Sequence, residues 1–330
     1  MQWNRVCIID ALAGVRSLPD GSVRTVVTSP PYFRQRDYGC AGQWGQEETP
    51  EAYVQHLVEL FGELHRVLRA DGTVWMVIGD SYASTSRGGQ AGRQRYGQEY
   101  GPAPGLYDGI KRKDLLGIPW TVALALRQQG WYLRQDIVWY KTNPMPESVK
   151  DRCTRCHEYV FMFSKSERYY YDHLVIAAQL SVATQVRMRQ NLENQRGSNR
   201  AWGKENGPMK ASFTAGKEDR HGRSYEGFSG RRATIQRSPM VANRKSVWPI
   251  ATAMSREEHY ASFPAAIPQL CIKAGSGEGD VVLDPFAGTG TTLLQASILG
   301  RRYMGFDLNE RYVAIARRRL KELEGLFYRE

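Results

Sequence analysis

Asp280-Val281-Val282-Leu283-Asp284-Pro285-Phe286-Ala287-Gly288-Thr289-Gly290-Thr291-Thr292 is the stretch of sequence that decides the fold. Its apolar, β-branched start at residues 280–284 predicts a buried strand, and its glycines predict a tight turn. Apolar spacing over residues 291–299 predicts a helix, and residues 302–307 predict the next strand. A strand, a glycine turn, a helix and a second strand together indicate one unit of an α/β sheet.

The glycine turn predicts a binding site for a nucleoside that carries no pyrophosphate. Glycine has no Cβ, so the backbone of the turn can approach a ligand closely. Asp307 ends the second strand, where a carboxylate can accept hydrogen bonds from a ribose diol, as in dinucleotide-binding folds. The glycines do not match Gly-x-Gly-x-x-Gly, and the turn lacks the lysine of a P-loop. Taken alone, a turn of this kind is as often structural as it is a binding site.

Strands and helices alternate along most of the remaining chain. Apolar, β-branched runs predict strands at residues 24–28, 73–78, 135–140 and 159–163, and helical spacing predicts helices at 52–68, 120–129 and 310–324. Asp71-Gly72 predicts a turn between the first of these helices and the strand that follows it. The alternation predicts an α/β fold with a doubly wound, mostly parallel sheet that helices cover on both faces.

The composition is that of a globular protein rather than a membrane or disulfide-rich one. The chain has 330 residues, of which 42% are hydrophobic, and no apolar run approaches the roughly 18 residues of a membrane span. Its first residues lack the pattern of a secretory signal. The five cysteines are few and scattered, which argues against a disulfide framework. We therefore expect a cytoplasmic protein with no membrane partner.

Positive charge is concentrated in one segment of the chain. The formal net charge is +11, and residues 181–245 hold 14 Lys and Arg against 5 Asp and Glu. This segment is either a solvated insertion or a region that contacts nucleic acid. Residues 84–109, rich in Gly, Gln, Arg and Tyr, predict a second irregular stretch, a flexible loop.

Thr28-Ser29-Pro30-Pro31-Tyr32 follows a predicted strand and is the most distinctive phrase outside the glycine turn. Two successive prolines fix φ and remove two N–H donors, which leaves a stiff turn with outward carbonyls. Such a turn can accept hydrogen bonds from an amino group while the aromatic ring stacks on a base. By itself, the pair of prolines favours an ordinary proline turn.

Together, this phrase and the glycine turn resemble the DNA methyltransferases that methylate exocyclic amino groups, cytosine N4 or adenine N6. The resemblance covers nearly the whole chain apart from the two irregular stretches. The catalytic phrase precedes the cofactor phrase, as in the permuted class called β. The resemblance implies a Rossmann-like methyltransferase fold with an inserted target-recognition region, S-adenosyl-L-methionine as cofactor, and double-stranded DNA as the partner from which one base is flipped.

The resemblance also implies roles for individual residues. Ser29, Pro30, Pro31 and Tyr32 are implied to be catalytic. The implied cofactor-binding residues are Asp10, Thr28, Phe263, Asp284, Pro285, Phe286, Gly288, Gly290, Thr291 and Asp307, with Phe263 in a phrase, residues 259–264, that resembles the opening of the family's cofactor helix. The implied target-base pocket holds Trp139, Lys141 and Asn143, within residues 136–148.

The order of these phrases divides the chain into three regions. Residues 1–180 are expected to form the catalytic half of the methyltransferase domain, 181–245 the basic target-recognition region, and 246–330 the cofactor-binding half. Such enzymes are of bacterial, archaeal or phage origin, and a cognate restriction endonuclease is an expected partner. The sequence leaves open whether the protein is a monomer or a homodimer.

Several alternatives remain at this point. Ser29 before Pro-Pro-Tyr favours cytosine N4, because the family places Asp or Asn there mostly for adenine N6. A methyltransferase for RNA or protein, and a DNA-binding relic without activity, are further alternatives. Cys153-Thr154-Arg155-Cys156-His157 matches a haem-attachment pattern, but haem attachment needs export and no signal is present. A zinc site that includes His173 is a weaker alternative to two ordinary thiols, and we expect no metal.

Overall fold

The computed structural model describes residues 2–83, 107–180, 241–252 and 263–327. The chain divides into two compact units: residues 1–175 with 245–330, and residues 176–244. In the second unit the structure describes a two-stranded antiparallel ribbon, β6 (Ala178–Gln179) with β7 (Val241–Ala242). Most of the loop expected at 84–109, most of the basic segment expected at 181–245, and residues 259–262 of the cofactor-helix phrase lie outside the described residues.

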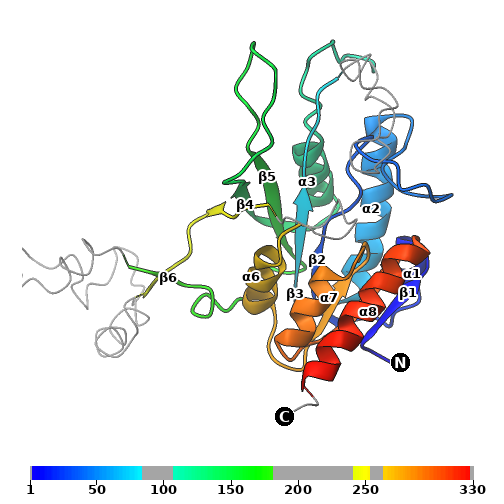
Figure 1. The fold of residues 1–330 in the computed structure, drawn as a ribbon, viewed down its shortest axis with the longest axis vertical. Helices are drawn as coiled ribbons and strands as arrows, with labels where there is room; N and C mark the ends of the chain where they lie inside the picture. The colour runs from blue at the N-terminus through cyan, green and yellow to red at the C-terminus, as the bar shows by residue number, and fades with distance from the viewer. Residues whose placement is uncertain (1, 84–106, 181–240, 253–262, 328–330) are drawn as a thin grey trace, which may run out of the picture. The chain divides into compact units, whose positions relative to one another are not determined.

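An eight-stranded sheet, as far as the chain is described, forms the centre of the first unit (Figure 1). Its order is β1-β10-β9-β2-β3-β5-β4-β8. The strands are β1 (Arg5–Ile8), β10 (Arg302–Asp307), β9 (Val281–Asp284), β2 (Val23–Thr28), β3 (Leu68–Ile78), β5 (His157–Ser164), β4 (Tyr132–Tyr140) and β8 (Val247–Pro249). The first five run parallel, β5 is antiparallel to both β3 and β4, and β8 is parallel to β4.

Helices cover both faces of this sheet. One set, α6 (Ala266–Gly275), α7 (Thr291–Ile298) and α8 (Glu310–Phe327), lies in front of the sheet in Figure 1. The other set is α1 (Ala11–Arg16), α2 (Pro50–Val67) and α3 (Ile118–Gln128). Neighbouring helices within each set pack on one another. The doubly wound, mostly parallel fold predicted from the sequence is therefore confirmed.

The helix α2 shows how the apolar pattern produces these layers. Thr49 caps it by accepting a hydrogen bond from the Ala52 N–H at 3.1 Å, and Pro50 begins it with a φ suited to a first turn. Leu57, Phe61 and Leu64, three and four residues apart, are fully buried. On the facing strands, all six residues of β2 are buried, as expected of a strand covered on both sides.

The turn predicted at Asp71-Gly72 is wrong, because α2 passes directly into β3 and both residues belong to that strand. The pairing of β2 with β3 is irregular here, because Val23 pairs with Leu68 and Thr25 pairs with Thr73. This shift accommodates the β3 residues between Leu68 and Thr73, which include Asp71 and Gly72. The Asp71 carboxylate forms an ion pair with Arg24 of β2. A buried guanidinium therefore holds in the sheet a dipeptide that is typical of turns.

The described residues contain no helix that is both long enough and apolar enough to cross a membrane.

Candidate active site

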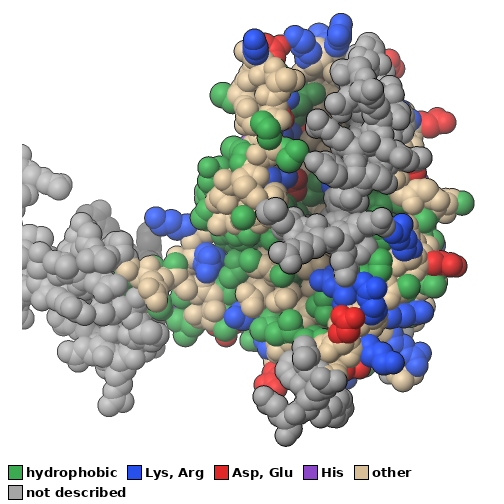
Figure 2. Space-filling view, in the orientation of Figure 1, with side chains coloured by type: hydrophobic (Ala, Val, Ile, Leu, Met, Phe, Trp, Pro, Cys, Tyr) green, Lys and Arg blue, Asp and Glu red, His purple; other side chains and the backbone are tan. Residues whose placement is uncertain are grey.

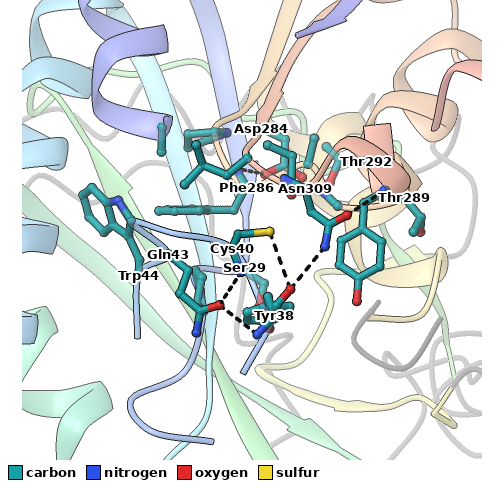
Figure 3. Close-up of a pocket in the computed structure, with 18 of the residues that line it drawn as sticks. Ser29, Tyr38, Cys40, Gln43, Trp44, Asp284, Phe286, Thr289, Thr292 and Asn309 are labelled. Carbon is teal, nitrogen blue, oxygen red and sulfur yellow. Dashed lines mark hydrogen bonds between the residues drawn. The ribbon is translucent and has the colours of Figure 1, made fainter. Parts of the chain in front are cut away.

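Four parallel strands end in polar side chains at one edge of the sheet. Asp10 follows β1, Asp307 ends β10, Asp284 ends β9 and Thr28 ends β2. Because the carboxyl ends of parallel strands meet at one edge, ligands of doubly wound folds bind there. A pocket lies at this edge (Figure 3). It is lined by Asp10, Ala11, Ser29, Pro31, Tyr38, Cys40, Gln43, Trp44, Phe263, Asp284, Pro285, Phe286, Ala287, Gly288, Thr289, Thr291, Thr292, Asp307, Leu308, Asn309 and Tyr312.

Asp284 is the most deeply buried carboxylate of the pocket, with 1% of its surface exposed. The Thr28 hydroxyl donates to its Oδ1 at 2.7 Å and the Phe286 N–H donates to the same atom at 3.1 Å. Burial raises the pKa of Asp284 to about 6, although these hydrogen bonds favour the charged form. A fixed carboxyl group therefore lies between β2 and β9 and titrates close to neutral pH.

Asp307 holds the glycine turn in place. Its Oδ2 accepts the Gly288 N–H at 2.8 Å and its Oδ1 accepts the Asn309 N–H at 2.8 Å. Gly288 has a φ of 52°, a left-handed value that glycine adopts without strain. Burial raises the pKa of Asp307 as well. The carboxylate at the end of β10 is thus linked to the glycine turn after β9 by a hydrogen bond.

Asp10 lines the pocket and also accepts two hydrogen bonds that hold the surrounding structure. Its Oδ1 caps α1 by accepting the Ala13 N–H at 3.0 Å, and its Oδ2 accepts the indole N–H of Trp44 at 2.9 Å. The Trp44 ring meets Phe286 edge to face, with ring centres 5.4 Å apart. Together they give this side of the pocket an aromatic surface beside a carboxylate.

The segment 38–44 was missed by the sequence reasoning, although it supplies much of the pocket wall. Gln43 Oε1 accepts the Tyr38 N–H at 2.8 Å and the Cys40 N–H at 3.3 Å, and the Asn309 amide donates to the Tyr38 carbonyl at 3.4 Å (Figure 3). No helical or strand period marks this segment. Its only signal in the sequence is the density of aromatic residues after the Pro-Pro phrase.

Tyr32 lies at the turn beside the pocket and does not line it. Its phenol donates to Glu158 Oε2 at 2.6 Å, and its ring packs against Gly79 at the end of β3. The Pro31 carbonyl accepts a hydrogen bond from the Tyr53 hydroxyl at 2.9 Å, which anchors the turn to α2. No hydrogen-bond partner is found for the Pro30 carbonyl within the described residues.

Most of the predicted cofactor residues meet in the pocket, and two lie behind it. Thr28 does not line the pocket, but its hydroxyl donates a hydrogen bond to Asp284, which does. Gly290 begins α7 with a φ of 81°, and a Cβ there would lie 2.9 Å from the Cβ of Ala316 on α8. Gly290 therefore allows two helices to pack closely, a reason that the sequence did not reveal.

The three residues of the predicted base pocket lie at the end of β4 and just beyond it. Trp139 is buried and donates its indole N–H to the Ile250 carbonyl at 2.8 Å. Asn143 Oδ1 accepts both the Thr252 N–H at 2.7 Å and its hydroxyl at 3.1 Å. Lys141 pairs with Glu158, the carboxylate that binds Tyr32. Lys141 is thereby connected to the Pro-Pro turn through the side chain of a glutamate that the sequence reasoning missed.

Comparisons with known proteins agree with this geometry. The family model described as DNA methylase, which covers the N6 and N4 methylases, matches residues 23–318. The chain belongs to this family of DNA methylases. It is therefore an enzyme that methylates an exocyclic amino group in DNA with S-adenosyl-L-methionine as methyl donor, and the family and cofactor predicted from the sequence are confirmed.

Relatives of the DNA methylase are similar over most of their length. It is 40% identical to the Type II methyltransferase M.Cfr9I of Citrobacter freundii, over 94% of this chain and 86% of that one. It is 38% identical to the Type II methyltransferase M.SmaI of Serratia marcescens, over 96% and 90%. The PvuII DNA methyltransferase, cytosine-N4-specific, shares the fold with a TM-score of 0.58 at 18% identity, over 96% of this chain and 89% of that one.

The Cys-x-x-Cys-His segment of the DNA methylase lies at the start of β5. Cys153 is exposed, Cys156 is half-buried, and both are free thiols. His157 pairs with Tyr140 of β4, and burial lowers its pKa. Within the described part of the chain, no group of three or more His, Cys, Asp or Glu residues is placed to hold a metal ion.

Gly79→Ala is expected to slow methyl transfer by the DNA methylase roughly 100-fold, the scale for a misplacement of about 1 Å. The new Cβ would lie 2.6 Å from Tyr32 Cε2, so the ring must move. Initial rates with labelled cofactor on duplex DNA measure the effect. Gly62→Ala on α2 is the control, because nothing lies within 4 Å of a Cβ there. Equal rates for the two variants would show that the position of the ring does not matter.

Proposed function

We propose that this DNA methylase transfers the methyl group to N4 of cytosine in duplex DNA, with the target base flipped out of the helix. Ser29 before Pro30-Pro31-Tyr32 carries the choice of base, because the resembling enzymes place Ser at this position mostly for cytosine. Adenine N6 is the alternative. The exocyclic nitrogen is enclosed by the base stack, so the reaction needs an extruded base in either case.

The chemistry of the pocket supports the binding of S-adenosyl-L-methionine. Within the described part of the chain, its lining includes three carboxylates, Asp10, Asp284 and Asp307, and neither Lys nor Arg. Such a lining suits a nucleoside with positively charged sulfonium and ammonium groups and no phosphate. We assign the charged groups to Asp284, the ribose diol to Asp307, and the adenine to Asp10 and the aromatic surface of Trp44 and Phe286. Phe263, Pro285, Gly288 and Thr291 complete the wall.

The turn at the end of β2 is suited to receive an amino group. The cofactor supplies an activated methyl group on its sulfonium, so the protein's main task is alignment. The Ser29 hydroxyl and the Pro30 carbonyl accept hydrogen bonds from the amino group, which enriches its nitrogen lone pair. The Tyr32 ring stacks on the flipped base. We place Trp139, Lys141 and Asn143 around that base. Lys141 is linked to Tyr32 through Glu158.

Two loops at the same edge form a basic surface that we propose contacts DNA. They are residues 107–117, before α3, and residues 141–156, between β4 and β5, and an ion pair of 2.6 Å between Lys113 and Asp151 joins them. Figure 2 shows Lys and Arg side chains gathered at the tips of the two projections in which Figure 1 draws these loops. Lys111, with 84% of its side chain exposed, and Lys150 carry charge there.

The basic segment 181–245 is our proposed target-recognition region, between the two halves 1–180 and 246–330. Its excess of Lys and Arg supports contact with phosphates or guanine edges. The relatives M.Cfr9I and M.SmaI are both named Type II methyltransferases. We propose a cognate restriction endonuclease as the partner of this chain that recognises the same DNA site.

Lys111→Gln combined with Lys150→Gln is expected to raise the Kd for duplex DNA. It should also lower the slope of log Kd against log salt by roughly 2, one unit for each lost phosphate contact. Fluorescence anisotropy over a salt series measures both quantities. Lys273→Gln on α6 with Lys321→Gln on α8 is the matched control for charge. An unchanged slope in the loop variant would remove these loops from the DNA surface.

Enzymatic digestion and mass spectrometry of methylated DNA test the proposed function directly. The expected product is N4-methylcytosine, found at one recognition sequence when the same DNA is sequenced with methylation detection. N6-methyladenine would overturn the choice of base. Labelled methyl groups in RNA and not in duplex DNA would overturn the substrate, and binding of cofactor without any transfer would indicate a relic of the fold.

A further inference from the structure

Glu158 reaches the catalytic turn from the other half of the sheet. It is the second residue of β5, which runs antiparallel to both β3 and β4. The beginning of β5 therefore lies at the edge where its two neighbours end. Glu158 is paired with Trp139 across the sheet, and its carboxyl carbon lies 3.4 Å from where a Cβ on Gly79 would be.

Both oxygens of the Glu158 carboxylate are engaged. Oε2 accepts the phenol of Tyr32 at 2.6 Å, and Oε1 pairs with the Lys141 ammonium. The Glu158 side chain is 14% exposed and that of Lys141 is 23% exposed. Lys141 also lies 5.0 Å from the centre of the Trp139 ring. A largely buried negative charge is thus neutralised and held in one position beside the turn.

The carboxylate fixes the direction of its hydrogen bond to Tyr32. A carboxylate that is ion-paired with Lys141 only accepts, so the Tyr32 phenol donates its proton to Glu158. A hydrogen bond to a charged acceptor is roughly twice as strong as a neutral one. With this bond at its hydroxyl end and Gly79 against its edge, the Tyr32 ring is held in one position beside the Pro-Pro turn.

We infer that Glu158 is a positioning residue of the methyl-transfer site. It acts through the Tyr32 phenol to hold the ring that stacks on the flipped base. Lys141 balances the negative charge of Glu158 at this largely buried place. This role rests on the proposed function, since it concerns the base that the enzyme methylates.

Glu158→Gln tests this inference, because a neutral glutamine side chain of the same size replaces the charge-assisted hydrogen bond to the phenol with a weaker one. The kcat on duplex DNA is expected to fall roughly 10- to 100-fold, the range for removal of an outer partner that orients a functional group. The KM and Kd for S-adenosyl-L-methionine should stay within about twofold, because Glu158 does not line the cofactor pocket. Glu63→Gln, a carboxylate ion-paired with Arg66 on α2, is the control variant.

A double-mutant cycle separates this role from a merely structural one. In a Tyr32→Phe background, Glu158→Gln should change kcat by less than about twofold, because the phenol that carries its effect is absent. An equal loss of kcat in both backgrounds, or no loss in the wild-type background, would overturn the inference. Glu158→Asp keeps the charge and draws the carboxylate back from the phenol. If Glu158→Gln unfolds the chain, as read by circular dichroism, Glu158→Asp replaces it in the cycle.

These outcomes are distinct from a failure of the proposed function. If the wild-type enzyme makes N6-methyladenine instead of N4-methylcytosine, the choice of base fails while the coupling between Glu158 and Tyr32 is still measurable. If the wild type makes N4-methylcytosine and Glu158→Gln keeps its full kcat, only the positioning role fails.

Discussion

Asp284→Asn is expected to weaken the binding of S-adenosyl-L-methionine at pH 8 by roughly 10- to 150-fold and at the same time to stabilise the fold. The loss corresponds to one charge-assisted hydrogen bond, about 1.5–3 kcal/mol. The asparagine Oδ1 can still accept from the Thr28 hydroxyl and the Phe286 N–H, so the local geometry is kept. Isothermal titration calorimetry measures the Kd.

The gain in stability follows from the pKa of about 6 that burial gives Asp284, against 3.8 for an unperturbed group. The folded state holds this proton more tightly than the unfolded state, so stability present below about pH 4 is lost as pH rises through 6. At pH 8 the buried charge costs about 3 kcal/mol. The Asn variant should therefore unfold several degrees higher than the wild type at pH 8, and the difference should shrink towards pH 4.

The same pKa predicts how cofactor binding depends on pH. The ionised carboxylate is the form that attracts a cation, so the wild-type affinity should fall as pH drops below about 6, while the Asn variant should show no such dependence on this group. Asp80→Asn is the matched control, because burial also raises the pKa of this carboxyl but it does not line the pocket. An unchanged Kd for Asp284→Asn at pH 8 would remove Asp284 from the cofactor site.

Tyr32→Ala is expected to reduce kcat/KM on duplex DNA below that of Tyr32→Phe by about 5- to 150-fold. This is the range that corresponds to the 1–3 kcal/mol by which an aromatic ring stabilises a stacked base. Tyr32→Phe retains the ring and loses only the phenol contact with Glu158, so the comparison isolates stacking. The Kd for the cofactor should be the same in both variants, because Tyr32 does not line the pocket.

Rates on a duplex that holds the target base opposite an abasic site sharpen this test. A base that has no pairing partner is flipped out at lower cost, so part of the Tyr32→Ala loss should be recovered there. Equal kcat/KM values for the Ala and Phe variants on the ordinary duplex would contradict a stacking role for the ring.

Much of the fold and half of the site were determined by local sequence. The alternation of apolar runs and glycine turns predicted the strands β2, β9 and β10 and the helices α2 and α8, because each of these patterns is read from neighbouring residues. The strand ends also placed Asp284 and Asp307 correctly, since parallel strands bring their carboxyl ends to one edge.

Tertiary structure decided what depends on residues distant in the chain. Asp71-Gly72 was expected to turn, but Arg24, on another strand, pairs with Asp71 and keeps it in the sheet. Glu158 is separated from Tyr32 by more than a hundred residues, and only the antiparallel direction of β5 brings them together. Trp44 lies in a segment without any period, so only the fold could place it beside Asp10. The sequence by itself determined the order of the elements and the chemistry at the ends of the strands. The tertiary structure alone decided which side chains hold that chemistry in place, because hydrogen bonds and ion pairs between distant elements leave no periodic signal in the chain.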